Sequence, residues 1–159
     1  MTLAIVCVGK LRERCWREAV AEYQKRLARL GGLSIVECTD LPEPKNASPA
    51  DLQRIVEAEG ASILGHLRPR DFVFALCVDG KQYTSPGLAE RLRALEDHGV
   101  GRAAFVIGGS NGLSAAVLAK AGERISFSPM TFPHQLARVM LAEQLYRSRK
   151  ILAGEAYHK

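Results

Sequence analysis

Short apolar runs alternate with longer amphipathic stretches along the whole chain. The apolar runs predict buried β-strands at residues 3–8, 33–38, 71–78, 103–107 and 125–127. The stretches between them repeat apolar residues every three or four positions and predict helices at residues 15–30, 49–67, 85–97, 114–121 and 134–149. Strands this apolar are covered on both faces, so the pattern predicts an α/β fold with a mostly parallel sheet flanked by helices. At 159 residues, we expect a single domain spanning residues 1–159.

Glycine, serine and proline mark several boundaries of these elements. Gly31 and Gly32 end the first predicted helix, since glycine readily adopts the backbone conformation that closes a helix. Ser48 and Ser85 each precede a proline, which predicts an N-cap followed by a first helical residue that needs no N–H donor. Residues 41–49 contain three prolines and an asparagine and predict an exposed, mobile loop.

The chain carries a modest positive charge. Its formal net charge is +5, with 47% hydrophobic and 25% charged residues, the proportions of a globular protein rather than a disordered or membrane chain. Basic residues outnumber acidic ones within residues 10–30 and again within residues 134–159. These two segments predict either an anionic partner or two solvated helix faces, and composition alone leaves both open.

The four cysteines and the short apolar runs indicate a cytoplasmic protein. Cys7, Cys15, Cys38 and Cys77 have no C-x-x-C spacing, so we expect neither a metal site nor a disulfide framework, and we interpret all four as small core residues. No apolar run is long enough to span a membrane, and no cleavage site follows the first apolar run. We therefore expect no membrane partner.

The stretch FVIGGSNGLS, residues 105–114, joins a predicted strand to a predicted helix and contains Gly108, Gly109 and Gly112. Ile107 stands where a dinucleotide-binding fingerprint needs its first glycine, and no lysine follows Gly112 as a P-loop requires. The first failure argues against a nicotinamide enzyme, and the second argues against a P-loop phosphate site. The loop is either a place where a flat or extended ligand approaches bare backbone, or a tight turn from strand to helix.

A second unusual stretch, ISFSPMTFPHQLARVMLAEQLYRS, occupies residues 125–148. Within it, residues 128–133 contain two prolines, a methionine and a phenylalanine, which exclude regular helix and predict a loop buried against another part of the protein. His134 then begins the last helix, where it either caps and packs the helix or faces a site. The chain ends in YHK.

Together, FVIGGSNGLS, ISFSPMTFPHQLARVMLAEQLYRS and the terminal YHK resemble the RlmH family of the SPOUT methyltransferase superfamily. The resemblance covers the whole chain, including VGK after the first strand and NASPADLQRIVEAEG at the second helix. It implies a SPOUT (α/β knot) methyltransferase fold with a C-terminal trefoil knot, a homodimer, and S-adenosylmethionine as the methyl donor. It also implies N3-methylation of a pseudouridine of 23S rRNA in the assembled ribosome.

By the same resemblance, the donor pocket is formed by three loops of this chain. Its residues would be Leu76, Gly108, Phe127, Ser128, Pro129, Met130, Thr131 and Phe132. Bare backbone and apolar walls would hold the methionine and adenosine parts of the donor. Such a reaction needs no metal and no covalent nucleophile, only positioning and a way to manage the acceptor proton.

The acceptor requires a base or a cation, because the N3 proton of a uracil ring must leave as the methyl group arrives. His158 is the candidate base. Arg138, Lys159 or His134 would stabilise the resulting anion or grip a phosphate, and Tyr157 would stack on or hydrogen-bond the target base.

The tail of one subunit is expected to complete the site of the other. Dimerisation would also bring the two basic segments together to hold phosphates. The family usually has His-Pro before the final tyrosine, whereas Glu155 and Ala156 stand there in this chain and remove a stiffening proline.

Two alternative functions remain open at this point. A SPOUT enzyme that acts on another RNA, such as tRNA, would share the donor loops and differ in its acceptor. A non-catalytic ribosome-binding module would keep the basic faces and bind no methyl donor.

Overall fold

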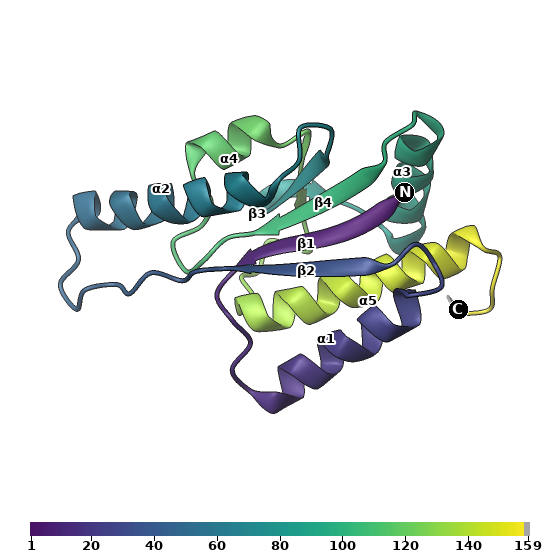
Figure 1. Ribbon diagram of the computed structural model, residues 1–159, viewed down its shortest axis with the longest axis horizontal. Helices are drawn as coiled ribbons and strands as arrows, with labels where there is room; N and C mark the ends of the chain where they lie inside the picture. The colour runs from purple at the N-terminus through teal and green to yellow at the C-terminus, as the bar shows by residue number, and fades with distance from the viewer. Residues whose placement is uncertain (158–159) are drawn as a thin grey trace.

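The computed structural model describes residues 1–157 and contains a five-stranded parallel sheet with helices on both faces (Figure 1). The elements follow one another as β1 (Thr2–Val8), α1 (Arg14–Leu27), β2 (Leu33–Cys38), α2 (Pro49–His66), β3 (Phe72–Gln82), α3 (Ser85–Asp97), β4 (Arg102–Ile107), α4 (Ala115–Lys120), β5 (Glu123–Ser126) and α5 (His134–Leu152). The strands lie in the order β2-β1-β4-β3-β5, and every pair is parallel. The α/β fold predicted from the sequence is confirmed.

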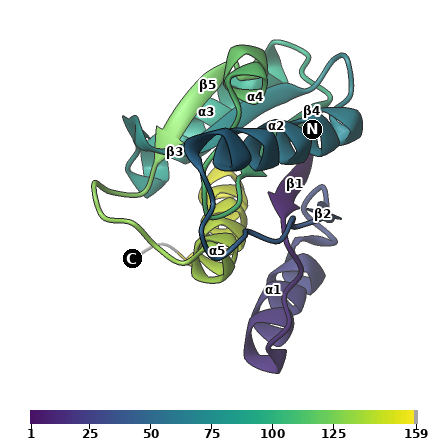
Figure 2. The same cartoon turned by 90° about the vertical axis from the view of Figure 1, so that its left-hand side faces the viewer.

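Two layers of buried apolar side chains cover the two faces of the sheet. Alternate residues of β1 point to opposite sides, so Ile5 packs with residues of α1, α3 and α5 while Val6 packs with residues of α2 and α4. Figure 2 shows α2 and α4 on one side of the sheet and α1 and α5 on the other. Because both faces are covered, the strands are apolar at nearly every position, as buried parallel strands are expected to be.

Local capping explains where α2 and α3 begin. The Ser48 side chain accepts a hydrogen bond from the Asp51 N–H, and Asp51 in turn accepts one from the Ser48 N–H, so the predicted cap of α2 is confirmed. The predicted cap of α3 was wrong by one residue, because Thr84, not Ser85, accepts from the Gly87 N–H. The Ser85 hydroxyl instead donates to Gln144 of α5, at 2.7 Å, a tertiary contact that local sequence does not reveal.

The edge of the sheet formed by β3 and β5 differs most from the sequence prediction. β3 extends to Gln82, beyond its predicted end at residue 78, and its pairing with β5 shifts between Leu76 and Lys81. A Cβ on Gly80 would overlap the backbone of Ile125, so only glycine lets the two strands approach this closely. β5 also ends at Ser126, which leaves Phe127 outside the strand.

In Figure 1, α5 runs from the middle of the molecule to its right-hand end. This helix has 19 residues, which at 1.5 Å per residue gives a length of about 28 Å. None of the helices described within residues 1–157 has the length and apolar character needed to cross a membrane. The strand order does not test the trefoil knot implied by the family resemblance, and the knot stays a prediction.

All four cysteines are free, but they do not share one environment. Cys7 and Cys38 are buried core residues as predicted, and burial raises the pKa of Cys7 to about 12. The prediction was wrong for Cys15, which lies exposed on α1. Cys77 is half-buried at the end of the regular part of β3.

Candidate functional site

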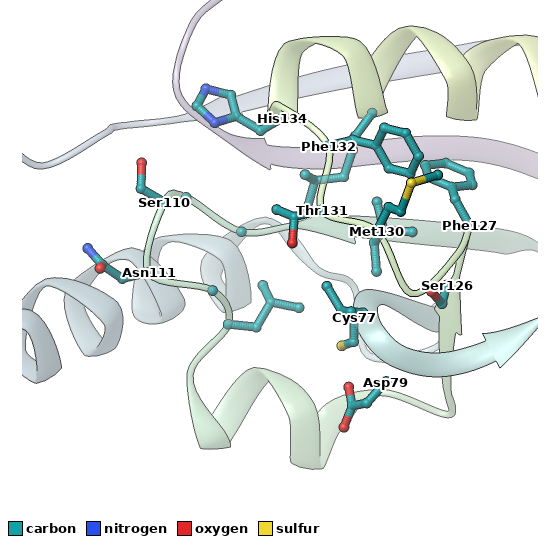
Figure 3. A pocket seen from close by; sticks show the side chains of 18 of the residues that line it. Cys77, Asp79, Ser110, Asn111, Ser126, Phe127, Met130, Thr131, Phe132 and His134 are labelled. Atoms are coloured by element: carbon teal, nitrogen blue, oxygen red, sulfur yellow. The ribbon is translucent and has the colours of Figure 1, made fainter.

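A cavity of about 430 Å³ lies where three loops meet at the carboxyl ends of β3, β4 and β5. Residues 76–79, residues 107–113 and most of residues 126–132 form its walls, and His134 and Ala137 of α5 close one side. Figure 3 shows Thr131 and Cys77 on opposite sides of this space. The volume falls in the range of small-molecule sites, and the position is the usual one for ligands of parallel α/β sheets.

The glycine loop, residues 107–113, is tightly folded against itself and against its neighbours. Gly109 and Gly112 pair as an isolated antiparallel bridge, and Gly112 has a φ of 83°, where a side chain is strained. A Cβ on Gly108 would lie 2.5 Å from the Gly112 carbonyl oxygen. The loop is therefore a tight turn and a wall of the cavity at once, so the two interpretations left open by the sequence are not exclusive.

Seven of the eight residues assigned to the donor pocket line this one cavity. They are Leu76, Gly108, Phe127, Ser128, Met130, Thr131 and Phe132, whereas Pro129 is not part of the lining. The lining also includes Cys77, Val78 and Asp79, which sequence reasoning missed. Cys77 and Val78 end the predicted third strand and Asp79 follows it, so the rule that ligands bind at carboxyl ends of strands was the signal that pointed to them.

The loop at residues 128–133 is less buried than the sequence predicted. Pro129, Met130 and Thr131 are exposed, and Met130 has 67% of its surface accessible. Ser128 accepts a hydrogen bond from the Met130 N–H, at 3.0 Å, and Phe127 and Phe132 pack edge to face. The loop thus directs its aromatic side chains inward and leaves Met130 on the outside of the chain.

Comparison with known proteins identifies the family to which this chain belongs. Residues 1–158 match the family described as predicted SPOUT methyltransferases. The chain is also 50% identical over 159 residues to ribosomal RNA large subunit methyltransferase H of Bifidobacterium animalis subsp. lactis (strain AD011), with all of both chains covered.

The chain belongs to the SPOUT methyltransferase family. Its resemblance to the RlmH family is thereby confirmed. The same fold occurs in a methylase family protein of Haemophilus influenzae Rd KW20, with a TM-score of 0.54 and 14% identity, covering 99% of this chain and 70% of that one. A methylase family protein of Neisseria gonorrhoeae gives a TM-score of 0.51 and 14% identity, covering 91% of this chain and 81% of that one.

Arg138 of this SPOUT methyltransferase is fully buried rather than displayed on a surface. Its guanidinium pairs with Glu37 at 2.6 Å and donates to the Gly9 carbonyl at 2.9 Å. Glu37 also accepts a hydrogen bond from the Leu11 N–H, at 3.1 Å. Among the described residues, the Nε of Arg138 has no hydrogen-bond partner. In the single chain, therefore, Arg138 ties α5 to the segment after β1 and is not positioned to grip a phosphate.

Replacing Arg138 with alanine should lower the free energy of unfolding by about 3 kcal/mol. Glu37 and the backbone carbonyls of Val8 and Gly9 would lose a buried cationic partner. Urea denaturation followed by circular dichroism measures this change. Arg14→Ala is the matched control, since Arg14 pairs with Glu18 on the exposed face of α1 and its loss should have no measurable effect. An unchanged unfolding curve for Arg138→Ala would contradict the structural role.

Tyr157 lies beyond the end of α5, in contact with α5 and not with the cavity. Its hydroxyl donates to Glu143 at 3.2 Å, its ring packs edge to face on Tyr146 at 4.9 Å, and the Arg147 guanidinium lies 4.8 Å from the ring centre. Partial burial and the nearby Glu143 carboxylate raise the pKa of Tyr157. His158 and Lys159, the candidate base and cation, lie outside the described residues.

Among the described residues that the sequence assigned to the acceptor site, His134 is the one that lies at the cavity. It lines the wall at the start of α5, and Figure 3 shows its ring beside Ser110 and Asn111 of the glycine loop. The start of α5 has no side-chain cap, so His134 does not cap its helix. Within residues 1–157, no cluster of three histidine, cysteine or acidic side chains could hold a metal ion.

Proposed function

We propose that this chain, as one domain over residues 1–159, transfers a methyl group from S-adenosylmethionine to N3 of a pseudouridine in 23S rRNA of the assembled ribosome. The observation that carries the proposal is the meeting of three loops around one cavity in a chain of the SPOUT methyltransferase family. A relative named for ribosomal RNA methylation, 50% identical over its full length, supports the choice of acceptor. Such a substrate implies action in the cytoplasm.

The residues of the cavity fit the proposed donor. Its volume, its largely apolar walls and the exposed backbone of the glycine loop suit a ligand with one flat ring system and one short polar chain. S-adenosylmethionine supplies a methyl group on a sulfonium that carries its own leaving group. The aromatic side chains of Phe127 and Phe132 and the backbone at Gly108 would then exclude water and hold the methyl group in line with the acceptor.

The chain must also manage the proton of the acceptor nitrogen. As the new N–C bond forms, the C–S bond breaks with its electron pair going to sulfur, and the N3 proton passes to a base. We assign that base to His158, with Lys159 or His134 stabilising the charge on the flanking oxygens. His134 is favoured for a role in the same chain because it lines the cavity.

We further propose that the enzyme works as a homodimer in which the tail of one subunit completes the site of the other. His134 at the start of α5 lines the cavity, whereas Tyr157 packs against Glu143 and Tyr146, from the middle of that helix onward. Glu143 and Tyr146 follow His134 by nine and twelve residues, so the anchor lies about 14 to 18 Å along the helix. The two residues that follow Tyr157 span at most about 7 Å, so they cannot easily return to their own cavity. A partner subunit is the direct way to bring His158 and Lys159 to a methyl donor.

Tyr157 is then an anchor for the tail and not a base-contacting residue. Tyr157→Phe should retain most methylation, because it loses one weak hydrogen bond worth about 1 kcal/mol and keeps the contacts with Tyr146 and Arg147. Tyr157→Ala should lose most methylation while donor affinity stays unchanged. Single-turnover rates and calorimetric titration of both variants separate the two effects. A loss in the phenylalanine variant as large as that in the alanine variant would indicate direct contact between the hydroxyl and the substrate.

Purified protein, labelled S-adenosylmethionine and ribosomes that lack the modification provide the test of the proposed function. Mass spectrometry then maps any methylated nucleotide. Methylation of a pseudouridine in 23S rRNA is the expected result. If a parallel reaction methylated tRNA and ribosomes remained unmethylated, the proposed acceptor would be wrong and the proposed donor would still hold. A protein that binds ribosomes without binding the donor would be a non-catalytic module.

A further inference from the structure

Glu59 of α2 is a buried carboxylate directly behind the wall of the cavity. Only 4% of its surface is exposed. Its Oε1 accepts a hydrogen bond from the Leu41 N–H at 3.2 Å, and its Oε2 would lie 2.7 Å from a Cβ built on Gly109. Because Gly109 lines the cavity, the carboxylate is separated from the cavity by one thickness of backbone.

The close packing of α2 fixes this carboxylate relative to the glycine loop. At the next residue, a Cβ on Gly60 would overlap the side chain of Ser114, which caps α4 at the far end of the loop. Residues 59 and 60 therefore contact both ends of the glycine loop. A second contact holds the same region, because the Asn111 amide donates to Glu43 at 3.0 Å. The position of the carboxylate is set by backbone packing and does not depend on a mobile side chain.

Burial of this charge is costly for the fold. A carboxylate removed from water is destabilised unless a cation pairs with it, and within the described residues no cation contributes to the electrostatics of Glu59. Among residues 1–157, the Leu41 N–H is the group that donates a hydrogen bond to this carboxylate. A charge kept without a partner next to a cavity is typical of a functional group rather than of core packing.

We propose that Glu59 is a specificity-determining residue that makes the cavity prefer a positively charged methyl donor over the uncharged thioether that remains after transfer. The inference rests on the proposed donor site. Donor and product have nearly the same shape, and the main electrostatic difference is the charge at sulfur. Since the backbone of Gly109 lies between Glu59 and the cavity, the charge acts through protein of low polarity and discriminates between the two. Asp79, which lines the cavity from the end of β3, adds to the same negative potential.

The preference should depend on pH. Burial raises the pKa of Glu59, the Leu41 N–H opposes that change, and the neighbouring Asp40 carboxylate adds to it. The Cys38 thiol also interacts with Glu59, and its pKa is raised mainly by burial and in part by Glu59 itself. Above its raised pKa, Glu59 is charged and favours the cationic ligand. As the pH falls through that value, the carboxylate is neutralised and the preference should fade.

Isothermal titration with S-adenosylmethionine and S-adenosylhomocysteine tests the proposal without any methyl transfer. The measured quantity is the ratio of the two dissociation constants in the wild type, in Glu59→Gln and in Glu57→Gln. Glu57 is the matched control because it lies on the same helix with an exposed side chain. Glu59→Gln should reduce the preference for the cationic donor by about tenfold, and Glu57→Gln should leave it unchanged. Sinefungin carries an amine in place of the sulfonium. Its affinity for Glu59→Gln should therefore be reduced, as the affinity for S-adenosylmethionine is.

Thermal unfolding separates this role from a purely structural one. Because burial raises the pKa of Glu59 in the folded state, the charged carboxylate destabilises the fold as the pH rises through that value. Glu59→Gln should therefore be at least as stable as the wild type at pH 7, although its ligand preference is weaker. An unchanged ratio in Glu59→Gln, or an equal change in Glu57→Gln, would overturn the proposal and leave the donor site intact. If the wild-type protein bound neither ligand, the proposed function would be wrong. The inference about Glu59, which rests on that function, would then fail as well.

Discussion

A mixture of two inactive variants should recover about a quarter of the wild-type methylation rate, because half of the reassembled dimers are mixed and each mixed dimer has one complete site. One variant lacks His158 and Lys159 and keeps its cavity. The other carries Gly108→Ala and keeps its tail. If tails act on the cavity of the partner, the mixed dimer combines the intact cavity of the first subunit with the intact tail of the second.

Each variant alone should methylate no ribosomes above background. The shortened variant should still bind S-adenosylmethionine with wild-type affinity, because the described contacts of the cavity do not include residues near the end of the chain. Mixing after mild denaturation and refolding allows subunits to exchange, and mass spectrometry of the intact dimers measures the mixed fraction. Mixed dimers that remain inactive would show that each tail serves its own subunit or that the tail is not part of the site.

Gly108→Ala should abolish donor binding while the protein remains folded. The added Cβ would lie 2.5 Å from the Gly112 carbonyl oxygen and 2.8 Å from its carbonyl carbon. These are backbone atoms of a loop that is closed by a bridge between Gly109 and Gly112, so they cannot rotate away as a side chain would. The glycine loop must open, and its backbone groups leave the wall of the cavity.

Gly65→Ala is the matched control for this change, since no atom lies within 4 Å of the position where its Cβ would be built. Gly65 lies within α2, and alanine there should stabilise the protein by up to about 1 kcal/mol. Calorimetric titration with S-adenosylmethionine and thermal unfolding of both variants provide the comparison. Wild-type donor affinity in Gly108→Ala would mean that the loop can move without affecting the site, and the assignment of the cavity would then be wrong.

The sequence predicted the strands and helices well where local signals and burial agree. β2 runs from Leu33 to Cys38 as predicted, and Ser48 caps α2 as predicted. These elements are determined by apolar periodicity and by side chains that bond to their own backbone, and both are local properties of the chain. The prediction was least accurate at the edge of the sheet. There, the pairing of β3 with β5 depends on how closely Gly80 approaches a strand about 45 residues further along the chain.

The candidate site was predicted with unequal success for a related reason. Motif resemblance identified seven residues that line the cavity, but it could not distinguish exposed from buried cations. Arg138 is of a residue type that often binds phosphate, but its side chain lies in a buried ion pair with Glu37. Whether a side chain is buried depends on all the elements packed around it. Arg138 lies on α5 and contacts Glu37 of β2 and the segment after β1.

By itself, the sequence determined the α/β class, the positions of most elements, the two loops of unusual composition and the resemblance to one family. Each of these depends on the order of residues over a few turns or strands. The tertiary structure alone decided that residues 76–79 join those two loops around one cavity, and that Glu59 lies behind Gly109. It also decided that Tyr157 packs against α5 and lies away from the cavity lining. The physical reason is that cavities, buried charges and anchored tails arise from packing between segments far apart in the chain, and no local pattern records that packing.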